Sequence, residues 1–329
     1  MIIRRAGTMT NAGLAAISIV FLSACSGPSL SGADVAPVVG DITINGAQVF
    51  PESVTHDSRG NLYNGSINGT IYRTLAGSGT AEPWILPNAQ NGLTSLFGVL
   101  ADERHGMLWV CNNPPFGGPP DPAAQSSLRG FDLTTGQLNA VFLMPAGKPA
   151  ACNDIAVAAD GSVWASETSG GRIFVLRPNA NELELFAEGE ELVGIDGLAF
   201  AEDGTLYINN VRRQKFQRVT RGDNGRYAGL TDLEVSAELG GPDGLRSLGG
   251  NRFLQAEGGS GRVALVDVSG NEARRTDIAT GLNGSVGATL MGETVYVVEG
   301  KINYLFDPAL KDQKPEPFII RAIPLREGQ

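Results

Sequence analysis

A unit of alternating hydrophobic and polar positions recurs along the chain. Its best-formed copy begins at Asn153, where a short apolar strand is followed by Asp160-Gly161 and by a second strand that contains Trp164. Asp-Gly between two apolar runs predicts a β-hairpin, because both residues tolerate the backbone angles of a tight turn. The aromatic residue of the second strand recurs at Tyr63, Trp109, Trp164, Tyr207, Phe253 and Tyr296.

This spacing predicts an all-β fold, a six-bladed β-propeller of four-stranded antiparallel blades. Units of short strands that repeat about every 40 to 50 residues are typical of propeller blades. The segments 42–50 and 317–324 are strand-like but belong to no unit, and we expect both to join the last blade and close the ring. Residues 42–329 are therefore predicted to form a single domain, and the insertion 112–125, with five prolines, should project from one end of its blade.

The N-terminal segment has a different composition from the repeats. Residues 1–24 combine two arginines with an apolar run that is too short to span a bilayer, which is typical of a signal peptide. The four residues ending in Cys25 resemble a bacterial lipobox, so we expect acylation of Cys25 and a flexible tether over 25–41. An ordinary secretory signal is the alternative. Both place the protein in the bacterial cell envelope on the periplasmic side, lipid-anchored with the outer membrane favoured, or secreted.

The net charge of the chain limits the partners that the protein can bind. The formal net charge of −10 argues against nucleic acid, whose phosphates require clustered Lys and Arg. We expect a monomer that contacts the membrane through its lipid anchor only.

Cys111 and Cys152 both fall at strand ends on the same side of adjacent blades, so they are either a disulfide or two buried thiols.

Carboxylates and amides stand where the innermost strands begin. In a propeller these strands line the central channel, so their first residues surround one mouth of it. Oxygen ligands without Cys or His suit a hard cation, Ca²⁺ above all. The residues at these positions are Glu52, Asn153-Asp154, Asp196, Asp243 and Asn283. The remaining strand start, 96–98, has no carboxylate or amide side chain.

Four short motifs in this order carry a family resemblance. They are P-E-S-V from Pro51, C-N-D-I-A from Cys152, G-I-D-G-L-A-F from Gly194 and G-P-D-G-L from Gly241. The chain resembles the senescence marker protein/gluconolactonase/luciferin-regenerating enzyme group over residues 42–325. The resemblance implies a divalent ion held by Glu52, Asp243, Asn153 and Asp196, with Asn153 on the substrate side.

Two positions depart from that family. Asp196 stands where the family usually has Asn. An added carboxylate would strengthen Ca²⁺ binding and weaken the pull of the ion on a carbonyl, or Asp196 would be protonated or act as a base. Ala151 stands where the family has the Arg that binds a sugar acid, which argues against an aldonolactone.

The function that the resemblance implies is metal-dependent hydrolysis of lactones or related cyclic esters. Asp243 or Asp196 would activate water, and Asn153, Asp154 and Asn283 would contact the substrate. A non-catalytic envelope lipoprotein that binds a ligand or partner, and an enzyme of the strictosidine-synthase type, are the alternatives. The acids that end three second strands either support the metal site or bind loop backbone; they are Glu167, Glu257 and Glu299.

Overall fold

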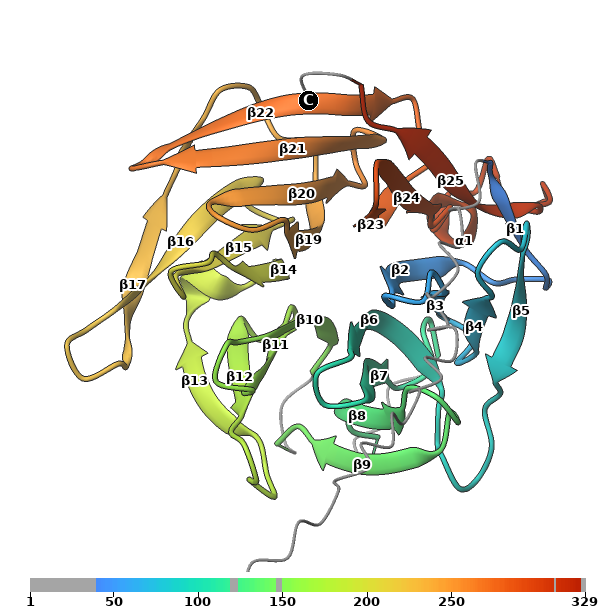
Figure 1. Cartoon of the computed structure of the whole chain (residues 1–329), viewed down its shortest axis with the longest axis horizontal. Coiled ribbons are helices and arrows are strands. Elements are labelled where there is room, and N and C mark those ends of the chain that lie inside the picture. Colours follow the sequence, from blue (N-terminus) through green and yellow to red (C-terminus); the bar gives the residue numbers. More distant parts are fainter. Residues whose placement is uncertain (1–39, 119–123, 146–149, 311, 327–329) are drawn as a thin grey trace, which may run out of the picture. The chain divides into compact units, whose positions relative to one another are not determined.

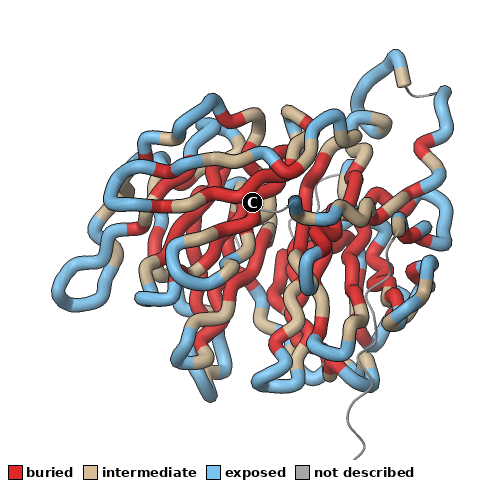
Figure 2. The backbone as a smooth tube through the Cα atoms, turned by 45° about the horizontal axis from the view of Figure 1, so that its top comes forward, coloured by how far each residue is buried: buried red, intermediate tan, exposed pale blue. Residues whose placement is uncertain are grey.

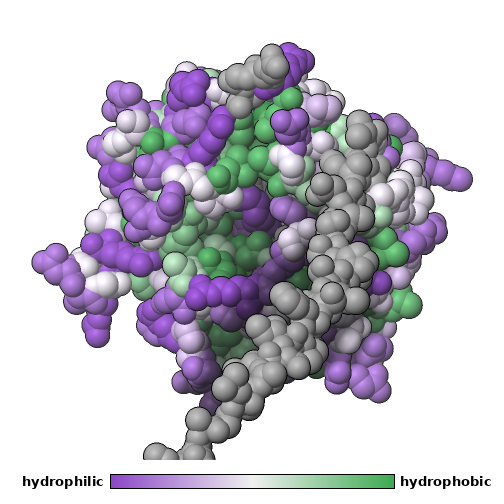
Figure 3. Space-filling model, viewed as in Figure 1, coloured by the Kyte–Doolittle hydropathy of each residue, from purple (hydrophilic) through white to green (hydrophobic). Residues whose placement is uncertain are grey.

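Four-stranded antiparallel sheets are arranged in sequence order around a common centre (Figure 1), and the space-filling view from the same side is hollowed there (Figure 3). The structure is a computed structural model that describes residues 40–118, 124–145, 150–310 and 312–326. The predicted signal peptide (1–24), the lipidation residue Cys25 and nearly all of the predicted tether (25–41) lie outside these residues. No helix within them is long and apolar enough to cross a membrane.

The first three blades follow the predicted hairpin units. Blade 1 contains β2 (Pro51–His56), β3 (Leu62–Ser66), β4 (Ile71–Thr74) and β5 (Thr80–Ile85). Blade 2 contains β6 (Ser95–Asp102), β7 (Met107–Asn113), β8 (Ser127–Asp132) and β9 (Leu138–Leu143). Blade 3 contains β10 (Cys152–Val157), β11 (Val163–Glu167), β12 (Arg172–Leu176) and β13 (Glu184–Glu188).

The later blades carry additions to this plan. Blade 4 contains β14 (Ile195–Phe200), β15 (Leu206–Asn210), β16 (Lys215–Arg221) and β17 (Tyr227–Asp232), preceded by the 3₁₀ helix η1 (Glu190–Leu192). Blade 5 contains β19 (Pro242–Ser247), β20 (Arg252–Glu257), β21 (Arg262–Ser269) and β22 (Glu272–Thr280), with the short β18 (Glu234–Val235) on its outer edge. Blade 6 begins with β23 (Ser285–Met291) and β24 (Thr294–Glu299), and the helix α1 (Asn303–Phe306) follows them.

Both ends of the described chain complete blade 6, as the leftover strand-like segments predicted. β25 (Phe318–Pro324) pairs with β24, and β1 (Ile42–Ile44) pairs antiparallel with β25. In addition β1 pairs in parallel with β5, so blades 1 and 6 form one eight-stranded sheet, which the sequence analysis did not predict. The six-bladed propeller predicted from the repeat is the fold of this protein.

The hydrophobic core lies between neighbouring blades. The six aromatic residues of the second strands are all buried, and Tyr63, for example, packs with Leu96 and Val99 of the next blade. Figure 2 shows the buried segments running along the strands and the exposed segments at the loops. Packing between blades holds the inner strands in a fixed ring, so the residues at the start of each inner strand have defined neighbours.

Candidate active site

A β-bulge near the start of each inner strand selects the side chain that enters the channel. The register with the second strand shifts at this point in β2, β6, β10, β14, β19 and β23. A bulge adds one residue to a strand and re-aims its side chain. The residues inside the six bulges are Glu52, Phe97-Gly98, Asn153-Asp154, Asp196-Gly197, Asp243-Gly244 and Val286.

The glycines in these bulges are required by close packing of the inner strands. A Cβ atom at Gly197 would meet the main-chain oxygen of Asp243, and one at Gly244 would meet the main-chain oxygen of Val286. The Asp-Gly pairs at 196 and 243 therefore lie in strands and not in the turns between blades. Each glycine lets the next blade approach, and each aspartate faces the channel.

Three carboxyl groups at the mouth affect one another strongly. Burial, followed by the charge of Asp196, raises the pKa of Glu52 to about 8. Burial, followed by the charge of Asp154, raises the pKa of Asp196 to about 7. Burial and the charges of Asp196 and Glu52 also raise the pKa of Asp243 well above its ordinary value. We call Glu52, Asp196 and Asp243 the mouth carboxylates; they lie close enough to disfavour simultaneous ionisation.

Asn153 is held against this group. Its Nδ2 donates to Oδ2 of Asp196 at 3.0 Å and to Oγ1 of Thr168 at 2.8 Å. The other oxygen of Asp196, Oδ1, is buried and accepts no N–H or hydroxyl hydrogen within the part of the chain that the structure describes, although the carboxyl group of Asp243 lies within hydrogen-bond reach of the Asp196 carboxyl. A buried acceptor without a donor is costly, so Asp196 is suited to a ligand that supplies positive charge.

The donor set fits a hard cation in its chemistry. Carboxylate and amide oxygens are the ligands of Ca²⁺, and mutual repulsion of three carboxylates is relieved by a dication. Across the described residues, however, no three or more His, Cys, Asp and Glu side chains are already arranged so that they could hold a metal ion. Side-chain movement at the mouth must therefore accompany binding of an ion.

Asp154 points deeper into the channel and is engaged in an ion pair. Its carboxylate accepts two bonds from Nη1 of Arg246, at 2.9 and 2.7 Å, and its residue is only 3% exposed. Nη2 of Arg246 donates to Oγ of Ser53 at 3.1 Å and to the main-chain oxygen of Val99 at 3.3 Å. Arg246 thus joins four blades across the channel. Sequence reasoning missed it, although an arginine inside an inner strand was the available signal.

A cavity of about 580 Å³ opens beside the mouth carboxylates. Glu52, Asp243 and Asn283 line it, together with Lys301 from the loop before α1 and Asn303, the first residue of α1. Asn283 lies before the bulge of its strand, and Val286 occupies the bulge position of blade 6. Of the residues predicted to contact substrate, Asn283 lines this cavity. Asn153 bonds to a mouth carboxylate, and Asp154 belongs to the Arg246 pair.

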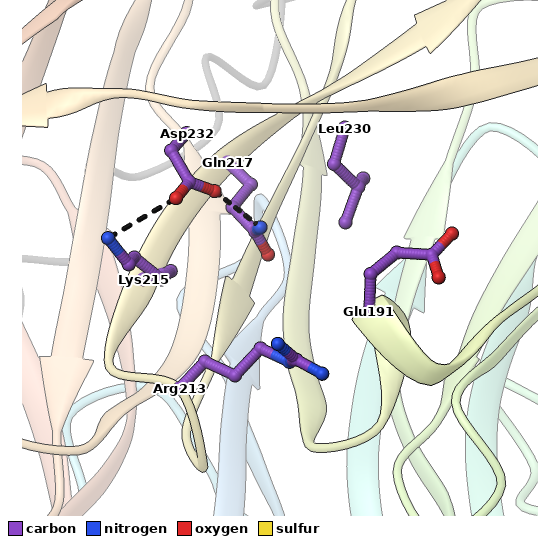
Figure 4. Close-up of a pocket in the computed structure, with 6 residues that line it drawn as sticks. All are labelled: Glu191, Arg213, Lys215, Gln217, Leu230 and Asp232. Carbon is purple, nitrogen blue, oxygen red and sulfur yellow. Dashed lines mark hydrogen bonds and ion pairs between the residues drawn. The ribbon is translucent and has the colours of Figure 1, made fainter.

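A second pocket, of about 490 Å³, lies on blade 4 (Figure 4). Oδ2 of Asp232 pairs with Nζ of Lys215 at 3.2 Å, and its Oδ1 accepts from Nε2 of Gln217 at 2.8 Å. Glu191, Arg213 and Leu230 complete the lining. The pocket contains none of the residues predicted to be functional.

Covalent and polar contacts brace the blades around the mouth. Cys111 of β7 and Cys152 of β10 form a disulfide, the first of the two alternatives for this pair. It connects blades 2 and 3 directly beside Asn153. In blade 2, Nδ2 of Asn113 also donates to the main-chain oxygen of Cys152 at 2.8 Å.

The acids that end three second strands bind loop backbone and arginine. Glu167 accepts from the backbone N–H of Ala151 at 2.9 Å and from Nε of Arg172 at 2.8 Å. Glu257 likewise accepts from the N–H of Gly240, and Glu299 from the N–H of Asn283, both at 2.8 Å. We call Glu167, Glu257 and Glu299 the rim glutamates; they fix the start of the inner strand beside them.

Comparison of folds places the chain among propeller proteins. A gluconolactonase from Xanthomonas campestris is similar to it, with 19% identity, a TM-score of 0.60 and coverage of 85% of this chain and 87% of that chain. Regucalcin from Agrobacterium tumefaciens, described as a calcium-binding protein, has 16% identity, a TM-score of 0.60 and coverage of 88% and 96%. Virginiamycin B lyase from Staphylococcus aureus has 16% identity, a TM-score of 0.56 and coverage of 85% and 81%. At such identities the likeness shows the fold alone.

Sequence comparison identifies the family. The search of curated proteins gave no match. The profile described as "SMP-30/Gluconolactonase/LRE-like region" matches residues 50–298, which include every mouth carboxylate. This protein therefore belongs to the SMP-30/gluconolactonase/LRE-like family.

Proposed function

We propose that this protein is a metal-dependent hydrolase of lactones or related cyclic esters, and that its ion is Ca²⁺. The observation that carries the proposal is the cluster of mouth carboxylates, whose pKa values are all raised beside an open cavity. Perturbed carboxyl groups in a cavity are typical of catalytic or ion-binding sites. Family membership supports a lactonase type of activity.

Glu52, Asp196, Asp243 and the amide of Asn153 would hold the ion. When bound, a dication supplies polarisation of the lactone carbonyl and stabilises the negative charge that develops on its oxygen. The chain itself positions these oxygens by the bulges of four inner strands. Nδ2 of Asn153 keeps Oδ2 of Asp196 oriented, which leaves Oδ1 for the ion.

Asp243 is the better placed of the two predicted bases. It lines the cavity with Glu52, whereas Asp196 is 5% exposed and bonded to Asn153. Its carboxylate oxygen lies at the cavity wall and would take the proton of a water molecule that attacks the lactone. Asp196 would then position the ion and contribute negative charge to its site.

A lactone panel with and without chelator tests the proposal. We expect hydrolysis that chelator abolishes and Ca²⁺ restores, and that Asp243→Asn reduces strongly. Activity that survives both treatments would refute this mechanism. No hydrolysis across the panel would instead favour a non-catalytic propeller that binds a ligand, or an enzyme of another type.

We also propose that Cys25 is acylated and anchors the protein in the bacterial cell envelope. The apolar run before Cys25 and the tether-like composition after it support this proposal. Mass spectrometry of the mature N-terminus tests it. A diacylglyceryl-modified Cys25 is expected, and an unmodified N-terminus produced by ordinary cleavage would contradict it.

A further inference from the structure

The ring of bulge residues is polar on one side and apolar around blade 1. Asn153, Asp196 and Asp243 come from consecutive blades, but Phe97 and Val286 come from the two blades that flank Glu52. Neighbouring inner strands are in contact around the whole ring, so Phe97 and Val286 lie on either side of the Glu52 strand. Val286 lines the substrate cavity and Phe97 lies on the other side of the Glu52 strand, so this strand has an apolar neighbour on each side.

Three aromatic rings extend this apolar side above blade 1. Phe97 packs edge-to-face on Phe116, with 5.9 Å between ring centroids, and Phe116 packs on Phe306 at 5.5 Å. Phe116 belongs to the proline-rich insertion of blade 2, and Phe306 belongs to α1 of blade 6. Segments from both flanking blades thus meet, and we call Phe97, Phe116 and Phe306 the aromatic cluster.

The aromatic cluster is continuous with the cavity and remains open. Asn303 lines the cavity, and Phe306 follows it by three positions in α1, which places both on one helix face. Phe306 is still 63% exposed although it packs on Phe116. Phe97 and Phe116 are only partly exposed, so the open ring of the cluster is that of Phe306. An exposed ring that rests on two others beside a cavity can pack against an apolar group of a ligand.

The lining of the cavity is mixed, because Ser260, Asn283 and Asn303 contribute polar side chains to it. Among the residues that line it, Lys301 carries the positive charge, and its Nζ donates to the main-chain oxygens of Pro315 and Pro317 at 2.9 and 2.7 Å. Leu282 and Ile302 add further apolar lining. Polar partners are therefore available inside the cavity, but the rings of the aromatic cluster beside it offer none, so hydroxyl groups placed against those rings would be penalised.

We propose that the ligand of this site is a lactone or cyclic ester with an alkyl or aryl substituent, which packs against the aromatic cluster while the ester faces the mouth carboxylates. The inference rests on the proposed function for the reacting group and on the aromatic cluster for the substituent. The substrate class is therefore defined by an apolar substituent of several carbon atoms.

The test measures binding as well as turnover. Isothermal titration compares three non-hydrolysable lactams: unsubstituted pyrrolidinone, 5-hexylpyrrolidinone and a polyhydroxylated gluconolactam. We expect the hexyl lactam to bind at least about 10-fold more tightly than the other two, as apolar groups in a fitting pocket do. Phe306→Ala should remove about 10-fold of that affinity. The matched control is Leu305→Ala, a neighbouring exposed residue of α1, which should change it less than about twofold.

The outcomes separate this inference from the proposed function. If the polyhydroxylated lactam binds as tightly as the hexyl lactam, or if Phe306→Ala binds like wild type, the inference is wrong even when lactones are hydrolysed. If the hexyl lactam is preferred through Phe306 but γ-decanolactone is not hydrolysed, the ligand class stands and the hydrolase proposal fails. Hydrolysis of γ-decanolactone in preference to glucono-lactone, weakened by Phe306→Ala, supports both.

Discussion

Two sets of buried carboxylates lie one strand apart at the same end of the blades, and their surroundings differ. Each rim glutamate accepts hydrogen bonds from the backbone of a loop and from an arginine, as Glu167 does with Ala151 and Arg172. The mouth carboxylates face one another, and burial together with their mutual charge raises their pKa values. Burial alone therefore does not tell a structural acid from a functional one.

The difference lies in which partners the fold supplies. A rim glutamate has its donors built into the blade, so its negative charge is balanced when the protein folds. Asp196 receives one amide bond from Asn153 and keeps one buried oxygen without an N–H or hydroxyl donor among the described residues. We infer that the mouth carboxylates depend on an external ligand for balance, whereas the rim glutamates do not. Four predictions test this contrast, from the largest expected effect to the smallest.

Neutralising one acid of each set should affect different properties. Asp243→Asn should lower kcat/KM for lactone hydrolysis by about 10² to 10⁴, because a proton acceptor at the reacting centre is lost. Glu167→Gln is the matched control, because it removes one buried carboxylate from the rim. Its kcat/KM per folded molecule should stay within about threefold of wild type. Equal losses of kcat/KM in the two variants would contradict the contrast between the mouth carboxylates and the rim glutamates.

Stability should respond in the opposite order. Glu167→Gln should lower the free energy of unfolding by about 3 kcal/mol, because a neutral amide cannot replace the charge-assisted hydrogen bonds that the buried carboxylate accepts from Arg172 and from loop N–H groups. Urea unfolding in the presence of chelator measures this loss. Asp196→Asn should leave the apoprotein as stable as wild type or more so, since it removes a repelling charge. A large destabilisation by Asp196→Asn would contradict its placement among the ligand-dependent acids.

Calcium should stabilise the protein only by binding at the mouth carboxylates. At a Ca²⁺ concentration 100-fold above Kd, we expect the free energy of unfolding to rise by about 2.7 kcal/mol. Asp243→Asn should lose most of this increase, whereas Glu167→Gln should retain it. Thermal unfolding with and without Ca²⁺ gives the comparison, and an increase retained in Asp243→Asn would place the ion elsewhere.

The pH dependence of the apoprotein should reveal the raised pKa values. For Glu52 and Asp196 the ordinary values are 4.5 and 3.8, and the folded values are about 8 and about 7. Between these values the folded protein binds more protons than the unfolded chain, so stability is greatest below them and is lost as the pH rises through the folded values. In chelator, urea unfolding from about pH 4 to about pH 9 should show stability that starts to fall near the ordinary pKa values and levels off above about pH 8. Asp196→Asn should flatten it, and a wild-type profile that rises throughout would refute the shifts.

The repeat in the sequence was sufficient to predict the blades and the end-to-end closure. Aromatic residues such as Tyr63 and Tyr296 mark the second strands because each packs between blades. The same periodicity placed Glu52, Asp196 and Asp243 at equivalent points of the ring. Their residue types, together with the family resemblance, indicated a cation site before any contact was known.

Features that depend on register and on distant partners could not be predicted from the repeat. The bulge of blade 6 selects Val286, and nothing in the local sequence distinguishes it from the nearby Asn283 as the bulge residue. Arg246 meets Asp154 across the channel, 92 positions away, so no local pattern links them. The aromatic cluster likewise joins the insertion of blade 2 to the helix of blade 6, and no local pattern links these two segments.

The closure of the ring has a consequence for biosynthesis. β25 is the last strand of the described chain, and it lies between β1, the first strand, and β24. Until residues 318–324 have left the ribosome, β24 and β1 both keep an unpaired edge, and such edges can pair with other chains. Closure of the ring therefore waits for these residues, and a chain that stopped before Phe318 would be prone to aggregate through the same edges.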